Sequence, residues 1–175
     1  MKQMWKKFDT VELSHSSIHH LLAIHSLVKE NGYARAIDIA KYLDITRSSV
    51  SKTLHKIKDK GFIFEDDNKF FRLTENGKKL VNSVLRRRCI VELFFTSVLQ
   101  VSAEVAEADG CKIEHLLSQE TSEKLFSFIS YFLSDSPSVK AFKKEYQNYS
   151  AKCESFTDGK ICEVDCFVTR NASDE

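Results

Sequence analysis

The sequence predicts a mainly α fold that carries one short β-hairpin. Apolar residues recur at helical spacing along most of the 175-residue chain, and a single Pro and five Gly are too few for a turn-rich sandwich or barrel. One segment breaks this period, because two aromatic runs flank a polar turn there. Hydrophobic residues make up 42% of the chain and charged residues 29%, a balance that excludes a disordered protein.

Three helices and the hairpin fill the first 74 residues. Apolar spacing places the helices at about 14–31, 36–43 and 47–60. Thr46 is suited to cap the third helix through its hydroxyl, and Gly61 ends it. The aromatic runs at 62–64 and 70–73 form the hairpin strands. Helices and hairpin in this order predict a winged helix-turn-helix.

The rest of the chain is expected to be helical up to a polar tail. The helical stretches are 74–99, 102–117, 120–133 and 139–146. A bend is expected in the second of these near Asp109 and Gly110. The predicted divisions are a winged helix-turn-helix domain at 1–74, an all-helical domain at 75–146 and a Cys-containing tail at 147–175.

Charge is distributed unevenly along the chain. Residues 1–90 hold 18 basic and 10 acidic side chains, for a balance of +8, whereas residues 91–175 have a balance of −7. A basic first half suits a polyanion, while an acidic second half suits cations or a protein. No stretch approaches the ~20 apolar residues of a membrane span, and the N-terminus lacks an apolar signal core. We therefore expect a soluble, cytoplasmic protein.

The third helix is predicted to bind double-stranded DNA in the major groove. Arg47 and Lys52 near its start are able to reach base edges or phosphates, hydroxyl groups are able to contact phosphates, and Lys69 of the wing extends the surface. The predicted DNA-binding residues are Thr46, Arg47, Ser48, Ser49, Ser51, Lys52, Lys56 and Lys69. The alternative is a helical protein–protein module with a lysine-rich surface.

A second cluster of residues points to metal binding. Cys111, Glu114 and His115 stand at i, i+3 and i+4, which brings three competent ligands onto one helix face. The alternative is a buried Cys beside an exposed acid–base pair. On the first helix, His15 and His19 lie one turn apart next to His20, and this group offers a further ligand.

These motifs resemble those of the metal-dependent repressors typified by the diphtheria toxin repressor and the manganese transport regulator. The resemblance runs from about 19 to 133, and its most specific motif surrounds Glu114 and His115. The motifs that carry it are Gly32–Arg35, Asp38–Ala40, Ser48–Lys52, Leu73–Lys78 and Ile113–Ser118. It implies a homodimer that binds a palindromic operator when a metal ion orders the first helix against the second domain.

The resemblance also implies a ligand set and an ion. Carried over position by position, the primary site comprises His19, Cys111, Glu114 and His115. Cys at position 111 is typical of iron-responsive members, and Glu of manganese-responsive ones. We therefore expect a repressor of metal uptake or homeostasis genes that responds to iron(II). Zinc(II), which suits thiolate and imidazole ligands, and manganese(II) are the alternative ions.

The second metal position of this family is altered in the sequence. Arg88 replaces the usual His ligand, and Leu22 replaces a first-helix carboxylate. Glu92 and Glu107 remain as weaker candidates for metal ligands. Because Arg88 and Glu92 lie one helical turn apart, we expect a salt bridge between them that leaves a single-ion site.

Two further interpretations belong to other classes of protein. One is a metal-independent winged-helix protein that binds DNA or a partner. The other is an enzyme with Cys111 and His115 as nucleophile and base, but no orienting third group or oxyanion-binding loop accompanies them, so no catalytic residues are expected. Cys153, Cys162 and Cys166 of the tail match no recognised zinc or iron–sulfur spacing.

Overall fold

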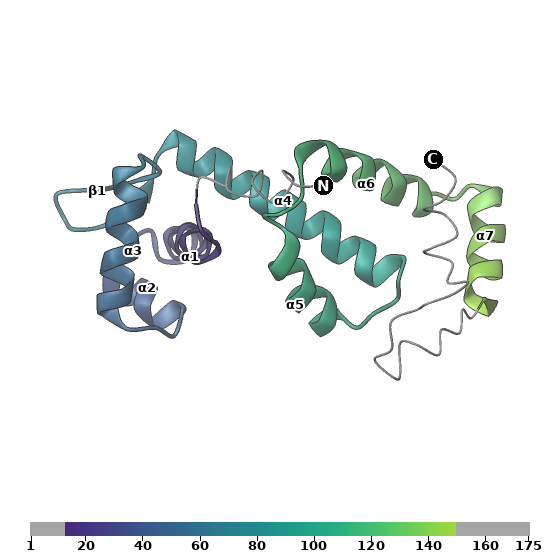
Figure 1. Ribbon diagram of the computed structural model, residues 1–175, viewed down its shortest axis with the longest axis horizontal. Coiled ribbons are helices and arrows are strands. Elements are labelled where there is room, and N and C mark those ends of the chain that lie inside the picture. The colour runs from purple at the N-terminus through teal and green to yellow at the C-terminus, as the bar shows by residue number, and fades with distance from the viewer. Residues whose placement is uncertain (1–12, 150–175) are drawn as a thin grey trace, which may run out of the picture. The chain divides into compact units, whose positions relative to one another are not determined.

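The computed structural model describes residues 13–149, and the predicted mainly α architecture is confirmed (Figure 1). Its first region is a helix-turn-helix followed by an antiparallel hairpin, in which Phe64 pairs with Arg72. The elements of this region are α1 (His15–Asn31), α2 (Ala36–Tyr42), α3 (Arg47–Asp59), β1 (Ile63–Glu65) and β2 (Phe71–Leu73).

Side-chain caps fix where the helices begin. The hydroxyl of Thr46 accepts a hydrogen bond from the Ser49 amide, and Ser14 caps α1 in the same way. Thr74 and Ser102 cap the next two helices. Helix α1 ends at Gly32, whose φ of 81° lies in the left-handed region that glycine adopts without strain. The predicted start of α3 at Arg47, directly after the Thr46 cap, is confirmed.

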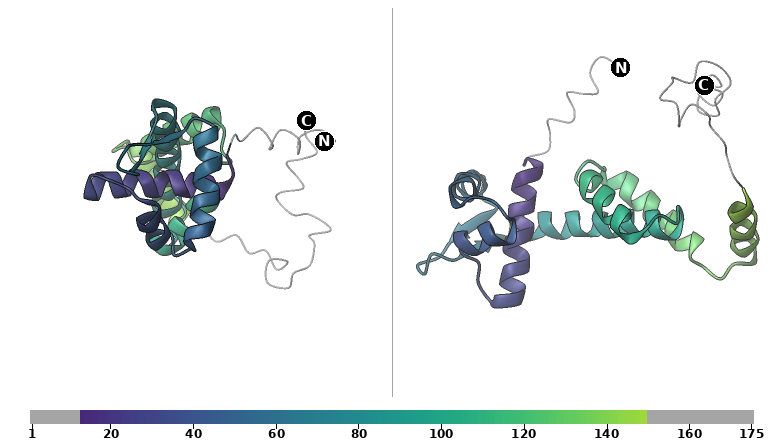
Figure 2. Two further views of the ribbon diagram at one scale, coloured as in Figure 1. Left: turned by 90° about the vertical axis from the view of Figure 1, so that its left-hand side faces the viewer. Right: turned by 90° about the horizontal axis from the view of Figure 1, so that it is seen from below.

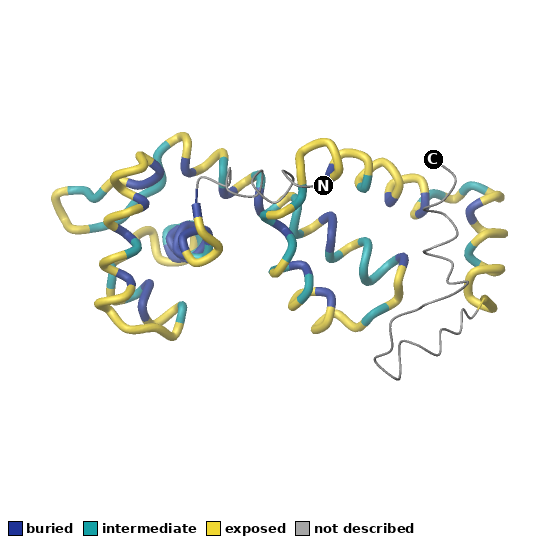
Figure 3. Tube along the Cα trace, in the orientation of Figure 1, coloured by how far each residue is buried: buried dark blue, intermediate teal, exposed yellow. Residues whose placement is uncertain are grey.

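Helix α1 forms the centre of the core. Leu21, Ala23 and Ile24 are completely buried, and residues from α2, α3 and the hairpin pack around them (Figure 3). In Figure 1 α1 is seen end on, and α2 and α3 lie beside it. The outer face of α3 stays exposed because Val50, Leu54 and Ile57 occupy its inner face.

Three further helices extend from the wing: α4 (Glu75–Ser97), α5 (Ala103–Ile113) and α6 (Gln119–Phe132). Helix α4 is long and continuous, and both α5 and α6 pack against it (Figure 2). Helix α5 continues through Asp109 and Gly110 and ends at Ile113 rather than at 117. Gly110 instead allows close helix packing, because a Cβ there would lie 3.1 Å from Cγ of Glu92 on α4.

Helix α4 also begins very close to the hairpin. A Cβ atom at Gly77 would lie 2.1 Å from the carbonyl oxygen of Phe62, so only a residue without a side chain fits. Thr74 strengthens this junction, because its hydroxyl donates to the Gly61 carbonyl at 2.8 Å and accepts from the Gly77 amide at 3.1 Å. The winged helix is thus joined directly to the long helix.

The chain divides into two compact units, 1–132 and 133–175. In the second unit α7 (Pro137–Asn148) begins with Pro at its first turn, where the missing amide proton costs nothing. Cys153, Cys162 and Cys166 lie outside the described residues. No helix within residues 13–149 is long and apolar enough to cross a membrane.

Candidate metal centre and nucleic-acid interface

Imidazole and thiol groups meet where the first turn of α1 faces the end of α5. His15 and His19 lie one turn apart on α1, and their Nε2 atoms are 3.0 Å from each other. The Sγ of Cys111 on α5 lies 3.4 Å from the same Nε2 of His19. One ligand atom from each of these residues lies within 4.8 Å of the others. The three donors therefore fit around a single metal ion.

Burial favours the neutral form of two imidazoles at this site, those of His19 and His115. Burial lowers the pKa of the His19 imidazole, and the nearby His15 lowers it further. Burial lowers the pKa of His115 as well, again with His15 as the next contribution. Neutral imidazoles have a free lone pair, which is the form that binds metal ions.

The carboxylate of Glu114 is paired with an arginine. Glu114 follows the end of α5 and is completely buried. Two N–H groups of Arg88, on α4, donate to its two oxygens, and the bond from Nη2 to Oε1 is 3.0 Å. The carboxylate stabilises the guanidinium and raises the pKa of Arg88. The expected salt bridge between Arg88 and Glu92 is wrong, because tertiary packing brings Glu114 to the arginine instead.

The remaining predicted ligands differ in their positions. His115 lies beside His15, with 3.4 Å between their Nδ1 atoms, rather than beside Cys111. Glu92 and Glu107 line a separate pocket of about 560 Å³ together with Arg88, and burial raises the pKa of Glu92. These carboxylates are not members of the three-donor cluster.

The histidines of α1 have two different environments. His20 is buried in the core, and its Nδ1 donates to the Ser16 carbonyl at 2.7 Å, so it is not part of the donor cluster. The sequence offered His15 only as one of three α1 histidines that supply a further ligand, and His15 was outside the ligand set that the resemblance implied. Its spacing of one turn from His19 was the available signal, but spacing alone does not show which face of α1 meets α5.

The predicted DNA-binding residues belong to α3, its N-cap and the wing. All eight are exposed, and they are Thr46, Arg47, Ser48, Ser49, Ser51, Lys52, Lys56 and Lys69. The backbone of Lys69 has a φ of 62°, and it stands at the tip of a hairpin turn that the Asp66 carboxylate stabilises through two backbone amides. An exposed basic helix beside a basic wing is suited to a phosphate backbone.

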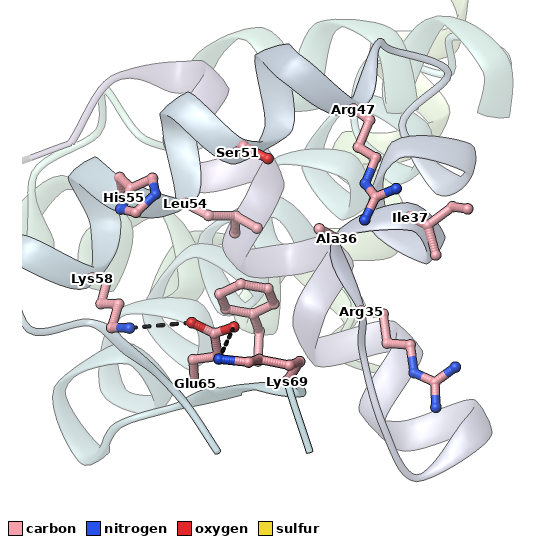
Figure 4. A pocket seen from close by; sticks show the side chains of 11 residues that line it. Arg35, Ala36, Ile37, Arg47, Ser51, Leu54, His55, Lys58, Glu65 and Lys69 are labelled. Carbon is pink, nitrogen blue, oxygen red and sulfur yellow. Dashed lines mark hydrogen bonds and ion pairs between the residues drawn. The ribbon is translucent and has the colours of Figure 1, made fainter. Parts of the chain in front are cut away.

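A pocket of about 360 Å³ separates α3 from the wing (Figure 4). Arg47 and Lys58 line it from α3, and Lys69 lines it from the hairpin. Glu65 balances part of this charge, because its carboxylate lies 3.3 Å from Lys58 and 4.0 Å from Lys69. The pocket keeps a positive excess on the predicted DNA-binding side of the domain.

Arg35 adds a cation to this surface that the sequence did not indicate. It lines the same pocket, just before α2, and its guanidinium lies over the rings of Tyr33 and Phe70, 5.2 and 4.9 Å from the centroids. These cation–π contacts hold the side chain in place. No periodic pattern connects Arg35 with α3, so only the tertiary fold brings them together.

Comparison with known families matches two successive parts of the chain. Residues 12–68 match the family model described as the iron dependent repressor N-terminal DNA binding domain. Residues 74–140 match the iron dependent repressor metal binding and dimerisation domain. Together the two matches cover most of the sequence.

Similar curated proteins are transcriptional regulators. The HTH-type transcriptional regulator MntR of Oceanobacillus iheyensis is 32% identical over 121 residues, which cover 69% of this chain and 82% of that protein. MntR of Bacillus subtilis is 30% identical over 131 residues, with coverage of 75% and 89%.

Solved structures share the fold at lower identity. The manganese regulator SloR has a TM-score of 0.60 and 23% identity over 66% of this chain, and ScaR with bound Zn²⁺ has a TM-score of 0.59 and 21% identity over the same share. The chain spans about half the length of either, at 54%. The hypothetical protein SSo2273 from Sulfolobus solfataricus is covered to 89%, with a TM-score of 0.57 and 22% identity. At these identities the likeness establishes the fold alone.

Proposed function

Because this chain belongs to the iron-dependent repressor family of metal-dependent transcriptional repressors, we propose that a divalent ion held between α1 and α5 activates its binding to an operator. The observation that carries the proposal is the approach of Cys111 Sγ to His19 Nε2, 3.4 Å across two elements far apart in sequence. A bound ion would supply a cation that holds the α1 imidazoles and the α5 thiolate together.

The first turn of α1 is the part of the molecule that such a site stabilises. His15 and His19 both lie in the first five residues of the helix, where backbone hydrogen bonding is incomplete. Their side chains face Cys111 rather than the core, whereas Leu21 and Ile24 further along α1 are fully buried. The donors therefore connect the first turns of α1 in the winged helix to α5 in the second region.

We propose iron(II) as the activating ion, with zinc(II) and manganese(II) as the alternatives to be tested beside it. The thiol of Cys111 supports this choice, because sulfur favours iron(II) or zinc(II) over manganese(II). Expected target genes are those of metal uptake or homeostasis.

The DNA-binding form is proposed to be a homodimer on a palindromic operator. The second region matches a metal binding and dimerisation domain, and the basic surface of α3 and the wing is exposed. Two copies would place two reading helices on successive half-sites, about one turn of DNA apart.

Fluorescence anisotropy tests this function directly. The full-length chain is titrated into a labelled palindromic duplex from its own promoter region, without oxygen, first in chelator and then with iron(II), manganese(II) or zinc(II). We expect at least one ion to raise the affinity by about 5- to 150-fold, the usual range of allosteric coupling.

Two cysteine variants provide a test and its matched control. Cys111→Ser should lose the metal response, whereas Cys89→Ser, on the exposed face of α4, should keep it. Equal affinity in chelator and in every metal would contradict the proposal and favour a metal-independent winged-helix protein.

A further inference from the structure

The donor atoms that meet between α1 and α5 are nitrogen and sulfur, with no oxygen among them. His15 and His19 offer imidazole nitrogens 3.0 Å apart, and Cys111 offers a sulfur 3.4 Å from His19. The grouping within 4.8 Å contains these three residues alone among the described part of the chain. Such a set is softer than the carboxylate-rich sites that manganese(II) prefers.

The ion pair with Arg88 explains why the Glu114 carboxylate supplies no oxygen donor to this cluster. Both oxygens of the Glu114 carboxylate accept hydrogen bonds from the Arg88 guanidinium, and the carboxylate is fully buried while the arginine side chain is 24% exposed. Freeing Glu114 for a metal ion would leave a partly buried guanidinium without its counter-ion, which is unfavourable. Arginine also remains charged at every physiological pH.

His115 contacts the donor cluster through another histidine. Its Nδ1 lies 3.4 Å from Nδ1 of His15, while Nε2 of His15 faces His19. When Nε2 of His15 carries the lone pair for a ligand, its Nδ1 carries the proton and donates to His115. His115 is then a positioning residue that fixes the tautomer and ring orientation of His15.

We propose that each subunit binds one ion of the borderline class, iron(II) or zinc(II), through His15, His19 and Cys111, and that the Arg88 guanidinium replaces a second cation by holding Glu114. The inference rests on the proposed function for the location of the site and deepens it by naming the ligands and the class of ion. Manganese(II) binds weakly to this set, although the solved regulator SloR is a manganese regulator.

The absorption spectrum of bound cobalt(II) reports which side chains bind the metal, in an assay that needs no DNA. The full-length chain is titrated with cobalt(II) in the absence of oxygen, and thiolate-to-cobalt charge transfer is followed by absorption. We expect one equivalent per subunit with a charge-transfer band and complete displacement by zinc(II). Iron(II) should displace cobalt(II) only when it is in excess, because it binds such sites less tightly than cobalt(II) does, and manganese(II) should displace little. Two equivalents per subunit, or manganese(II) competing as well as zinc(II), would overturn the proposal.

Variants on α1 test the new ligand. His15→Ala should weaken cobalt(II) binding by about tenfold or more, and His115→Gln should weaken it less while keeping the charge-transfer band. His25→Ala is the matched control, because His25 is a partly exposed histidine of the same helix outside the donor cluster. Unchanged affinity in His15→Ala would remove His15 from the site.

Arg88 is tested by a gain of function. Arg88→Ala frees the Glu114 carboxylate and should raise manganese(II) affinity by about tenfold, and Arg88→Ala/Glu114→Ala should abolish that gain. Circular dichroism checks that both variants fold; if they do not, the manganese(II) competition on the unaltered chain still decides the class of ion. No gain in a folded Arg88→Ala would refute the role of the guanidinium.

These outcomes separate the inference from the proposed function. If one thiolate-bound cobalt(II) ion is found but the DNA affinity does not change with metal, the proposed site stands and the proposed regulatory function is rejected. If manganese(II) drives metal-dependent DNA binding, the proposed function stands and the proposed site is rejected. Anisotropy with iron(II) and with zinc(II) then distinguishes the two ions that share this chemistry.

Discussion

Residues 13–74 and residues 75–132 bury their apolar side chains very differently. The continuous core fills the winged helix and extends into α4 only as far as Val84, so it is almost entirely a property of the first region (Figure 3). The second region buries few large side chains, with Ile129 and Phe132 as the main ones on α6. Helix α6 instead exposes three aromatic rings, those of Phe126, Phe128 and Tyr131.

This difference separates a region that supplies its own core from one that requires additional contacts. Exposed aromatic side chains clustered on one helix are typical of an interface with another protein. The second region is also the part that matches a dimerisation domain. We therefore expect the first region to fold at any protein concentration and the second to gain stability from a second copy.

The largest expected effect is loss of a core side chain in the first region. Ile57 is completely buried on the inner face of α3, so Ile57→Ala should lower the free energy of unfolding by about 2–5 kcal/mol. Ile37→Ala, on the exposed face of α2, should cost much less. Urea denaturation followed by circular dichroism measures both. Equal losses of unfolding free energy in the two variants would mean that the buried Ile57 contributes no more to stability than the exposed Ile37.

A charge at Phe126, an exposed aromatic residue of α6, should weaken the expected self-association. Phe126 is 58% exposed and lines a pocket of about 810 Å³ between α4 and α6. Phe126→Glu should weaken self-association by about 2 kcal/mol or more, as expected for an aromatic anchor of an interface. Sedimentation equilibrium measures it, with Tyr42→Glu as the control because Tyr42 is 52% exposed in the first region. A dimer that survives Phe126→Glu would place the interface elsewhere.

Removing charge from the start of α3 should weaken DNA binding without affecting the second region. Arg47→Ala/Lys52→Ala should cost about 1–3 kcal/mol of operator affinity and make the affinity less dependent on salt, because both side chains are exposed toward the expected groove. Lys112→Ala, which removes an ion-paired lysine of α5, is the control. Anisotropy at several salt concentrations with metal saturating gives both quantities. Unchanged affinity in the double variant would show that another surface binds the operator.

The smallest expected effect is on the pH dependence of stability. Burial lowers the pKa of His20, so the unfolded chain takes up a proton at higher pH than the folded chain does. The free energy of unfolding therefore falls as the pH drops below the ordinary histidine pKa of about 6.5, with a slope of up to about 1.4 kcal/mol per pH unit. His20→Leu should make this slope shallower in chelator. An identical slope in the variant would assign the dependence to other groups.

The sequence predicted the fold well because local signals agree with one another. Thr46 caps α3, apolar spacing places Val50, Leu54 and Ile57 inward, and aromatic runs around a polar turn form the hairpin. The approach of α1 to α5 was also predicted through His19 and Cys111, but only because these positions correspond to ligands in a family with similar motifs.

The rest of the site depends on tertiary geometry that no periodic pattern encodes. Arg88 was expected to pair with Glu92 one turn away, but α5 ends early and directs Glu114 into the arginine. His15 and His19 have the same helical spacing as many exposed pairs, so their role depends on which face of α1 meets α5. Buried ion pairs and donor clusters of this kind form between elements rather than within one.

The close contact at Gly77 limits which amino acids this position accepts. Even a methyl group at this position would collide with the Phe62 carbonyl. The Thr74 hydroxyl holds the two contacting segments together, because it donates to the Gly61 carbonyl and accepts from the Gly77 amide. The donor cluster of His15, His19 and Cys111 does not include this position, yet a collision here would tilt α4 and carry Arg88 with it. In a library of all twenty amino acids at this codon, selected for repression in living cells, we expect only glycine to be recovered.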